Sequence, residues 1–117
     1  MRNINKLSSG YEVIEFEELD STMTMMKEMV LAGCNIKTVV RAKRQISGRG
    51  RHGRVWESPL GNLYFSFLRQ SEKNNRNIFA PVFISALSVA YTIIYVTKNK
   101  IIPSIKWPND ILINKSK

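Results

Sequence analysis

The chain has 117 residues, 44% of them apolar, which is typical of one small packed domain rather than a disordered chain. Its 18 Lys and Arg residues outnumber its 9 Asp and Glu residues, and the net charge of +9 suggests a polyanionic partner or substrate. One cysteine excludes an internal disulfide and a multi-cysteine metal site, and no apolar run of signal-peptide length begins the chain, so we expect a cytoplasmic protein.

The first half of the chain predicts two strands separated by a helix. Residues 1–9 are polar and are expected to form a frayed lead-in, whereas residues 11–19 alternate in a way that predicts a strand. A helix is predicted next, because Asp20 or Ser21 can cap it, apolar residues recur at helical spacing, and Gly33 fits its C-terminal stop. Residues 36–41, with two adjacent valines, predict a second strand.

The second half begins with a Gly- and Arg-rich loop, SGRGRHGRVW at residues 47–56. A strand is predicted at 63–68, a surface connection at 71–77, a helix with a wide apolar face from Phe79 to Ile94, and strands at 104–107 and 111–113. The order β-α-β-β-α-β-β predicts an α+β fold in which a mixed β-sheet is flanked by helices on one side.

Residues 78–96 form an uncharged stretch of nineteen residues, which meets the length rule for a membrane span. Five moderately polar side chains interrupt it, and Pro81 occupies a position that the first turn of a helix accepts. These features favour a buried core helix, with a membrane anchor as the alternative.

The Gly- and Arg-rich loop has the composition of an anion-binding loop. Glycines allow backbone N–H groups to approach an anion closely, and arginines supply forked donors. Six cations between Arg41 and Arg54 occur with no acid among them, which predicts a local anion site. A loop that binds nucleic-acid phosphates would carry the same residues, so a basic nucleic-acid-binding module is the alternative. His52 is interpreted as a surface residue, and Trp56 as either an anchor of the loop or a stacking platform.

Five motifs in order resemble the catalytic domain of biotin protein ligases, which has a class II aminoacyl-tRNA synthetase-like fold. They are DST at 20–22, Gln45, GRGRHGR at 48–54 followed by Trp56, GNLYFS at 61–66, and KWPND at 106–110. The resemblance covers about residues 11–115, and the related lipoate ligases use a different glycine-rich signature. It implies that biotin's carboxylate attacks the α-phosphate of ATP to give biotinyl-5'-adenylate. A lysine of a biotin carboxyl carrier domain would then attack this anhydride to form an amide.

The resemblance also implies a set of site residues. Ser21 and Thr22 would lie at the ureido end of biotin, with Gln45 nearby. Arg49, Arg51 and Lys106 would be catalytic, directed toward carboxylate and phosphate, because fixed cations stabilise the charge that develops there. Mg²⁺ would accompany ATP without a dedicated protein site, so no metal ligand is predicted. The remaining binding residues would be the rest of the loop, which orders over biotin and the adenylate, and the tryptophan on its nucleotide side: Gly48, Gly50, Gly53, Arg54 and Trp56.

The chain departs from the family pattern at one site position and at its end. Met23 stands where the family usually has asparagine, which removes an amide that could hold the biotin site. The family continues beyond KWPND with further sheet strands and a small β-barrel, and its repressor members carry a DNA-binding helix-turn-helix before the domain. We therefore expect residues 1–117 to be the N-terminal part of a catalytic domain, incomplete and impaired in catalysis, without a DNA-binding domain or membrane contact. A homodimer is compatible with the resemblance.

Overall fold

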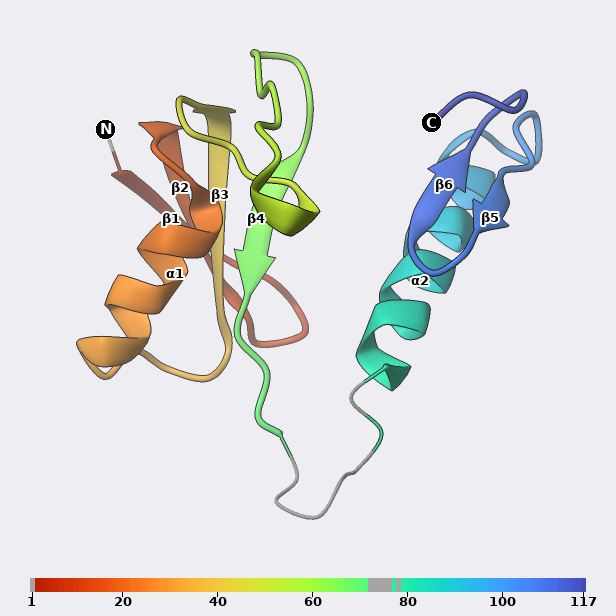
Figure 1. The fold of residues 1–117 in the computed structure, drawn as a ribbon. Coiled ribbons are helices and arrows are strands. Elements are labelled where there is room, and N and C mark those ends of the chain that lie inside the picture. Colours follow the sequence, from red (N-terminus) through yellow and green to blue (C-terminus); the bar gives the residue numbers. More distant parts are fainter. Residues whose placement is uncertain (1, 72–76, 78) are drawn as a thin grey trace. The chain divides into compact units, whose positions relative to one another are not determined.

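The computed structural model describes residues 2–71, 77 and 79–117, which form two compact units, Met1–Gln70 and Ser71–Lys117 (Figure 1). The first unit contains β1 (Arg2–Lys6), β2 (Glu12–Leu19), α1 (Thr22–Leu31), β3 (Thr38–Gln45), the 3₁₀ turn η1 (Arg51–Gly53) and β4 (Tyr64–Phe67). The second contains α2 (Ala80–Val96), β5 (Ser104–Lys106) and β6 (Asp110–Leu112). That residues 1–117 belong to one domain stays a prediction.

The first unit is a four-stranded mixed sheet with one helix on it. The strand order is β1-β2-β3-β4, with β2 and β3 parallel and the other two pairs antiparallel. A parallel pair needs a crossover connection, which α1 supplies, and α1 covers one face of the sheet (Figure 1). Ile14, Val40 and Ala42 of the sheet are buried together with Met26 of α1. The predicted α+β fold with a mixed sheet is confirmed.

The N-terminal residues are a strand, so the predicted frayed lead-in is wrong. β1 pairs antiparallel with β2, and Ile4 lies opposite Ile14. A turn closes this hairpin, in which the Leu7 N–H donates to the Tyr11 carbonyl (2.8 Å) and Gly10 adopts a φ of +84°. An edge strand with an exposed face can be mostly polar, and for that reason its composition resembles that of a disordered end.

The strand predicted at 36–41 begins later and ends later than expected, as β3 at Thr38–Gln45. Asn35 delays its start, because its side-chain oxygen accepts from the Lys37 N–H (2.9 Å) and its carbonyl accepts from the Thr38 hydroxyl (2.6 Å). Its end is extended because β2 continues alongside it as far as the pair Leu19 and Gln45. Local hydrogen bonds of Asn35 therefore set the start of the strand, and pairing with β2 sets its end.

The helix of the second unit, α2, has the expected extent, with Pro81 in its first turn, but only Ala86 and Ala90 of it are buried, so the expected buried core helix is not what the structure shows. The hydroxyls of Ser85, Ser88 and Thr92 each donate to the carbonyl four residues earlier, at 2.7 Å. Their polarity is thus satisfied within the helix. Within the described part of the chain, no helix has the length and apolarity needed to cross a bilayer.

The two final strands were predicted, and they form a separate two-stranded antiparallel sheet packed on α2. Lys106 lies opposite Asp110, on either side of a turn that contains a cis Trp107–Pro108 peptide bond. The Trp107 ring contacts that of Phe83, with centroids 4.7 Å apart. The surface connection predicted at 71–77 lies mostly outside the described residues.

Candidate active site

Gln45, the last residue of β3, connects three segments of the first unit. The Thr22 N–H at the start of α1 donates to Gln45 Oε1 (2.8 Å), and Gln45 Nε2 donates to Ser58 Oγ (3.0 Å). The backbone N–H of Gln45 also donates to the Ser58 carbonyl (3.1 Å). Thr22 and Gln45, which are 23 residues apart in sequence and were both predicted as site residues, are therefore in direct contact.

The start of α1 is held by two buried hydroxyl residues. Ser21 caps the helix, since its Oγ accepts from the Met23 N–H (3.2 Å), and it is this residue rather than Asp20 that serves as the cap. The Thr22 hydroxyl is hydrogen-bonded to the Ser66 hydroxyl of β4 at 2.9 Å. Ser66 was not predicted as a site residue, although it belongs to the GNLYFS motif.

Gly48 lies in the tightly packed base of the loop. Its carbonyl accepts from the Trp56 N–H (2.9 Å), which closes the loop across its neck. A Cβ at Gly48 would overlap both Ser58 Oγ and the Trp56 carbonyl oxygen. Glycine is required here because the protein's own atoms approach closely, and not only because a ligand could approach the backbone.

The tip of the loop is exposed and rich in cations. Arg51 and Arg54 are exposed and form no ion pair with any residue that the structure describes. Arg49 is also exposed, and its Nη2 donates to the Thr24 hydroxyl of α1 (2.6 Å). His52 is exposed, as predicted, and adopts a φ of 58° in η1. The loop thus combines an ordered base with a solvent-facing tip.

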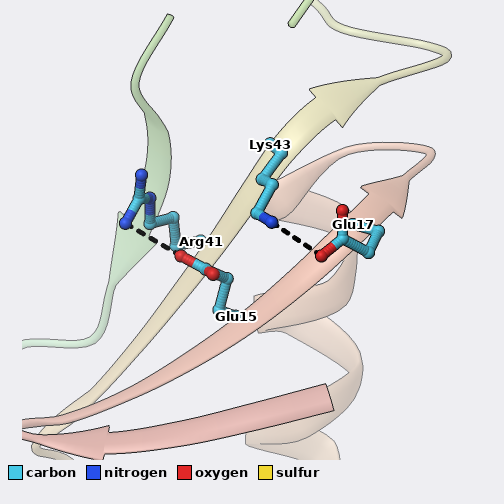
Figure 2. A network of polar contacts seen from close by, with 4 residues as sticks. All are labelled: Glu15, Glu17, Arg41 and Lys43. Carbon is cyan, nitrogen blue, oxygen red and sulfur yellow. Dashed lines mark hydrogen bonds and ion pairs between the residues drawn. The ribbon is translucent and has the colours of Figure 1, made fainter. Parts of the chain in front are cut away.

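The cations of β3 are not part of this tip. They form ion pairs with three glutamates of β2, two of which Figure 2 shows: Arg41 with Glu15 (2.8 Å), Lys43 with Glu17 (2.7 Å) and Arg44 with Glu18 (3.1 Å). Three of the six cations between Arg41 and Arg54 are thus already paired with acids, although Arg44 also lines the larger hollow beside the loop. The parallel register of β2 and β3 brings the glutamates beside them.

The ion pair between Lys43 and Glu17 shifts the pKa of both side chains. The hydrogen bond from Lys43 lowers the pKa of the Glu17 carboxyl below its ordinary value. The same hydrogen bond raises the pKa of Lys43. Each shift favours the charged form, so both groups stay ionised near neutral pH.

Two hollows flank the base of the loop. A cavity of about 270 Å³ lies at the start of α1, and its lining includes Ser21, Thr24 and three carboxylates, Glu18, Asp20 and Glu28. A larger one of about 560 Å³ lies on the loop side, lined by Arg44, Gln45, Ile46, Val55, Trp56, Glu57, Ser58, Pro59 and Leu60. The second has the size of a small-molecule site, and the half-exposed Trp56 contributes an aromatic wall to it.

Two further positions that the sequence singled out, Lys106 and Met23, are both exposed. Lys106 is exposed on β5 in the second unit, so its place beside the loop stays a prediction. Met23 is exposed at 55%, on the first turn of α1. Among residues 2–71, 77 and 79–117, no group of three or more His, Cys, Asp or Glu side chains is placed to hold a metal ion.

Known proteins resemble this chain in sequence and in structure. The bifunctional ligase/repressor BirA of Bacillus subtilis is 33% identical over 109 residues, which is 92% of this chain and 33% of that protein. The biotin protein ligase of Aquifex aeolicus, solved in complex with biotin and ATP, superposes with a TM-score of 0.74 and 39% identity over 85% of this chain and 40% of that one. The biotin protein ligase of Leishmania major, solved in complex with biotinyl-5-AMP, superposes with a TM-score of 0.72 and 29% identity. The match covers 88% of this chain and 47% of that one.

The chain spans less than half the length of each of these three proteins. The sequence profile of the biotin/lipoate A/B protein ligase family matches residues 15–117, which include the DST, GRGRHGR, GNLYFS and KWPND motifs. The resemblance on which the predicted site was built is confirmed, and this chain belongs to the biotin/lipoate A/B protein ligase family.

Proposed function

We propose that this protein activates biotin with ATP to form biotinyl-5'-adenylate and transfers the biotinyl group to a lysine of a biotin carboxyl carrier domain. The main support for this proposal is a set of contacts at the base of the loop. A partly buried hydrogen-bond network joins Thr22, Gln45 and Ser58 at the base of the GRGRHGR loop, in a chain that over 85% of its length is 39% identical to a protein solved with biotin and ATP.

The residues at the start of α1 suit the ureido end of biotin. A ureido group presents one carbonyl acceptor and two N–H donors, and hydroxyl groups can serve as either partner. Ser21 and Thr22 are buried, at 5% exposure each, and Gln45 lies against Thr22. Recognition by buried polar groups would be selective, because a ligand lacking the ureido group would leave them unpaired.

The loop cations suit the charge that the two steps create. In the first step a carboxylate oxygen of biotin bonds to the α-phosphorus and pyrophosphate leaves with the electrons of the broken P–O bond. In the second the lysine amine attacks the acyl carbon, loses a proton, and AMP leaves. The Arg49 and Arg51 guanidinium forks and the Lys106 ammonium would stabilise the phosphate oxygens, with Mg²⁺ bound to ATP itself.

A second function, binding of nucleic acid by the basic loop, is favoured by one observation. The side chains of Arg51 and Arg54 are exposed and lack ion pairs within the described residues, which is how phosphate-binding arginines are presented. This function does not account for the network beneath the loop.

Calorimetric titration of the folded chain with biotin tests the proposal. We expect saturable binding that Gln45→Ala weakens about tenfold, because the change removes two side-chain hydrogen bonds. Gln70→Ala, at an exposed position, is the matched control and should bind like the unaltered chain. Biotin-dependent ATP–pyrophosphate exchange measures the first chemical step in the same samples.

A folded chain that does not bind biotin would contradict the proposal. Single-stranded oligonucleotide binding with a steep salt dependence, unaffected by biotin, would support the second function instead.

A further inference from the structure

We infer that Ser58 is a positioning residue that orients the Gln45 side chain and ties the GRGRHGR loop to the biotin site. The ligand-binding part of this inference rests on the proposed function, whereas the ordering of the loop does not. Ser58 forms an isolated antiparallel bridge with Gln45 just after the loop, and it lies outside every motif by which the family resemblance was recognised. It is nevertheless 5% exposed and contacts both ends of the loop base.

The direction of the hydrogen bonds follows from chemistry. The Thr22 backbone N–H can only donate, so the atom of the Gln45 amide that faces it at 2.8 Å must be the oxygen. Gln45 Nε2 then faces Ser58 Oγ as a donor, at 3.0 Å. The Ser58 hydroxyl accepts that bond and directs its own proton to the Trp56 carbonyl, also at 3.0 Å. The Thr22 N–H therefore sets which amide atom faces α1, and the Ser58 hydroxyl holds the Nε2 end of the amide in place.

The Ser58 hydroxyl also holds the C-terminal end of the loop by a hydrogen bond. The Trp56 carbonyl and N–H are both engaged at the base, the carbonyl by Ser58 and the N–H by the Gly48 carbonyl. Gly48 leaves room for Ser58 Oγ, since a Cβ there would overlap it. Removing the hydroxyl would leave Gln45 Nε2 and the Trp56 carbonyl without this partner in a partly buried position. Both the amide orientation and the loop base would then be free to change.

The experiment compares four variants made in a Trp107→Phe background, in which Trp56 is the remaining one of the two tryptophans. Ser58→Ala removes the hydroxyl, Ser58→Cys keeps the volume with a weak hydrogen-bonding group, and Ser58→Thr restores the hydroxyl. Ser47→Ala, at the exposed serine immediately before the GRGRHGR segment, is the matched control. Acrylamide quenching of Trp56 without ligand reports loop order, and calorimetry reports biotin affinity.

We expect Ser58→Ala and Ser58→Cys to increase the quenching of Trp56 and to weaken biotin binding about tenfold, the effect of losing two neutral hydrogen bonds. Ser58→Thr and Ser47→Ala should match the background protein in both measurements. A merely space-filling role predicts instead that Cys is tolerated and Thr is not. That pattern would overturn the inference, as would unchanged quenching in Ser58→Ala.

Far-UV circular dichroism establishes that each variant is folded before it is compared. If Ser58→Ala does not fold, the Cys and Thr variants decide the question. If the background protein itself does not bind biotin, the proposed function fails, and the inference about loop order is still judged by the quenching data.

Discussion

Two neighbouring stretches of the chain use the same residue types in opposite ways. Residues 41–44 and residues 49–54 each carry three cations, and the cations in the strand are paired with glutamates while those in the loop are not paired with any described acid. β2 runs beside β3 only as far as the pair Leu19 and Gln45. Past that point no acidic strand lies alongside among the described residues, so the cations keep their full charge for another partner.

This difference shows that a run of basic residues is not one functional unit. Ion pairs between exposed side chains on adjacent strands contribute little stability, but each places a negative charge directly beside its cation. The loop cations instead extend from a base built by Gln45, Gly48 and Ser58. Three predictions separate the two stretches and the base between them.

The largest expected effect is that of Gly48→Ala, which would disrupt the base and release the loop from the strand. Because the added Cβ would overlap a backbone carbonyl and Ser58 Oγ, the free energy of unfolding should fall by about 1–3 kcal/mol. Urea denaturation measures it. Gly50→Ala is the control, since a Cβ there would meet its nearest atom at an ordinary 3.6 Å. Equal stability of the two variants would refute the close packing at Gly48.

An intermediate effect is expected from neutralising Arg51 of the loop, or Glu15, the β2 partner of Arg41 in the strand. Arg51→Gln should weaken binding of a non-hydrolysable biotinyl-adenylate analogue about tenfold, because it removes a charge-assisted donor, and should change unfolding by less than about 0.5 kcal/mol. Glu15→Gln should do the reverse, lowering stability by up to about 1 kcal/mol and leaving analogue binding intact. Calorimetry and urea denaturation of both variants test this. A loss of analogue binding in Glu15→Gln would show that the paired cations of the strand also contribute to ligand binding.

The smallest effect is expected from the pH dependence of the Lys43 and Glu17 pair. Since the folded pKa of Glu17 is lowered, its contribution to stability is present above the ordinary glutamate pKa of about 4.3 and is lost as pH falls through the lowered value. Since the pKa of Lys43 is raised, its contribution is lost only as pH rises through that raised value. Urea denaturation should show Glu17→Gln slightly less stable at pH 7, with the difference vanishing at low pH and at high salt. A difference that grew on acidification would contradict the assignment.

Local patterns were enough to predict most elements of the fold. The alternation in residues 11–19, the capped helix with Gly33 after its end, and the helix with Pro81 in its first turn all reappear in the structure. These signals succeed because each depends on neighbours within a few residues. β1 was missed because a polar edge strand carries no such local signal, and its partner, β2, supplies the hydrogen bonds that make it a strand.

The residues of the candidate site also fall into two groups, those that local motifs indicate and those that only tertiary contacts reveal. The order of the DST, GRGRHGR, GNLYFS and KWPND motifs identifies the family and indicates Thr22, Gln45 and Gly48 as site residues. Ser58 was not indicated because a lone serine outside the motifs has no distinctive local pattern, and Ser66 was not indicated although it lies in the GNLYFS motif, because the motif does not show which of its side chains faces Thr22. Only their contacts with Gln45 and Thr22 place them at the site.

The sequence by itself determined the family, the secondary structure of most segments, and the surplus of positive charge. Tertiary structure decided which cations are neutralised, which serines are buried at the loop base, and why Gly48 tolerates no side chain. The physical reason is the distance along the sequence over which each kind of interaction acts. Propensity and capping act over one turn or one strand, whereas ion pairs and buried hydrogen bonds join residues whose separation in sequence says nothing about their distance until the strand register is set.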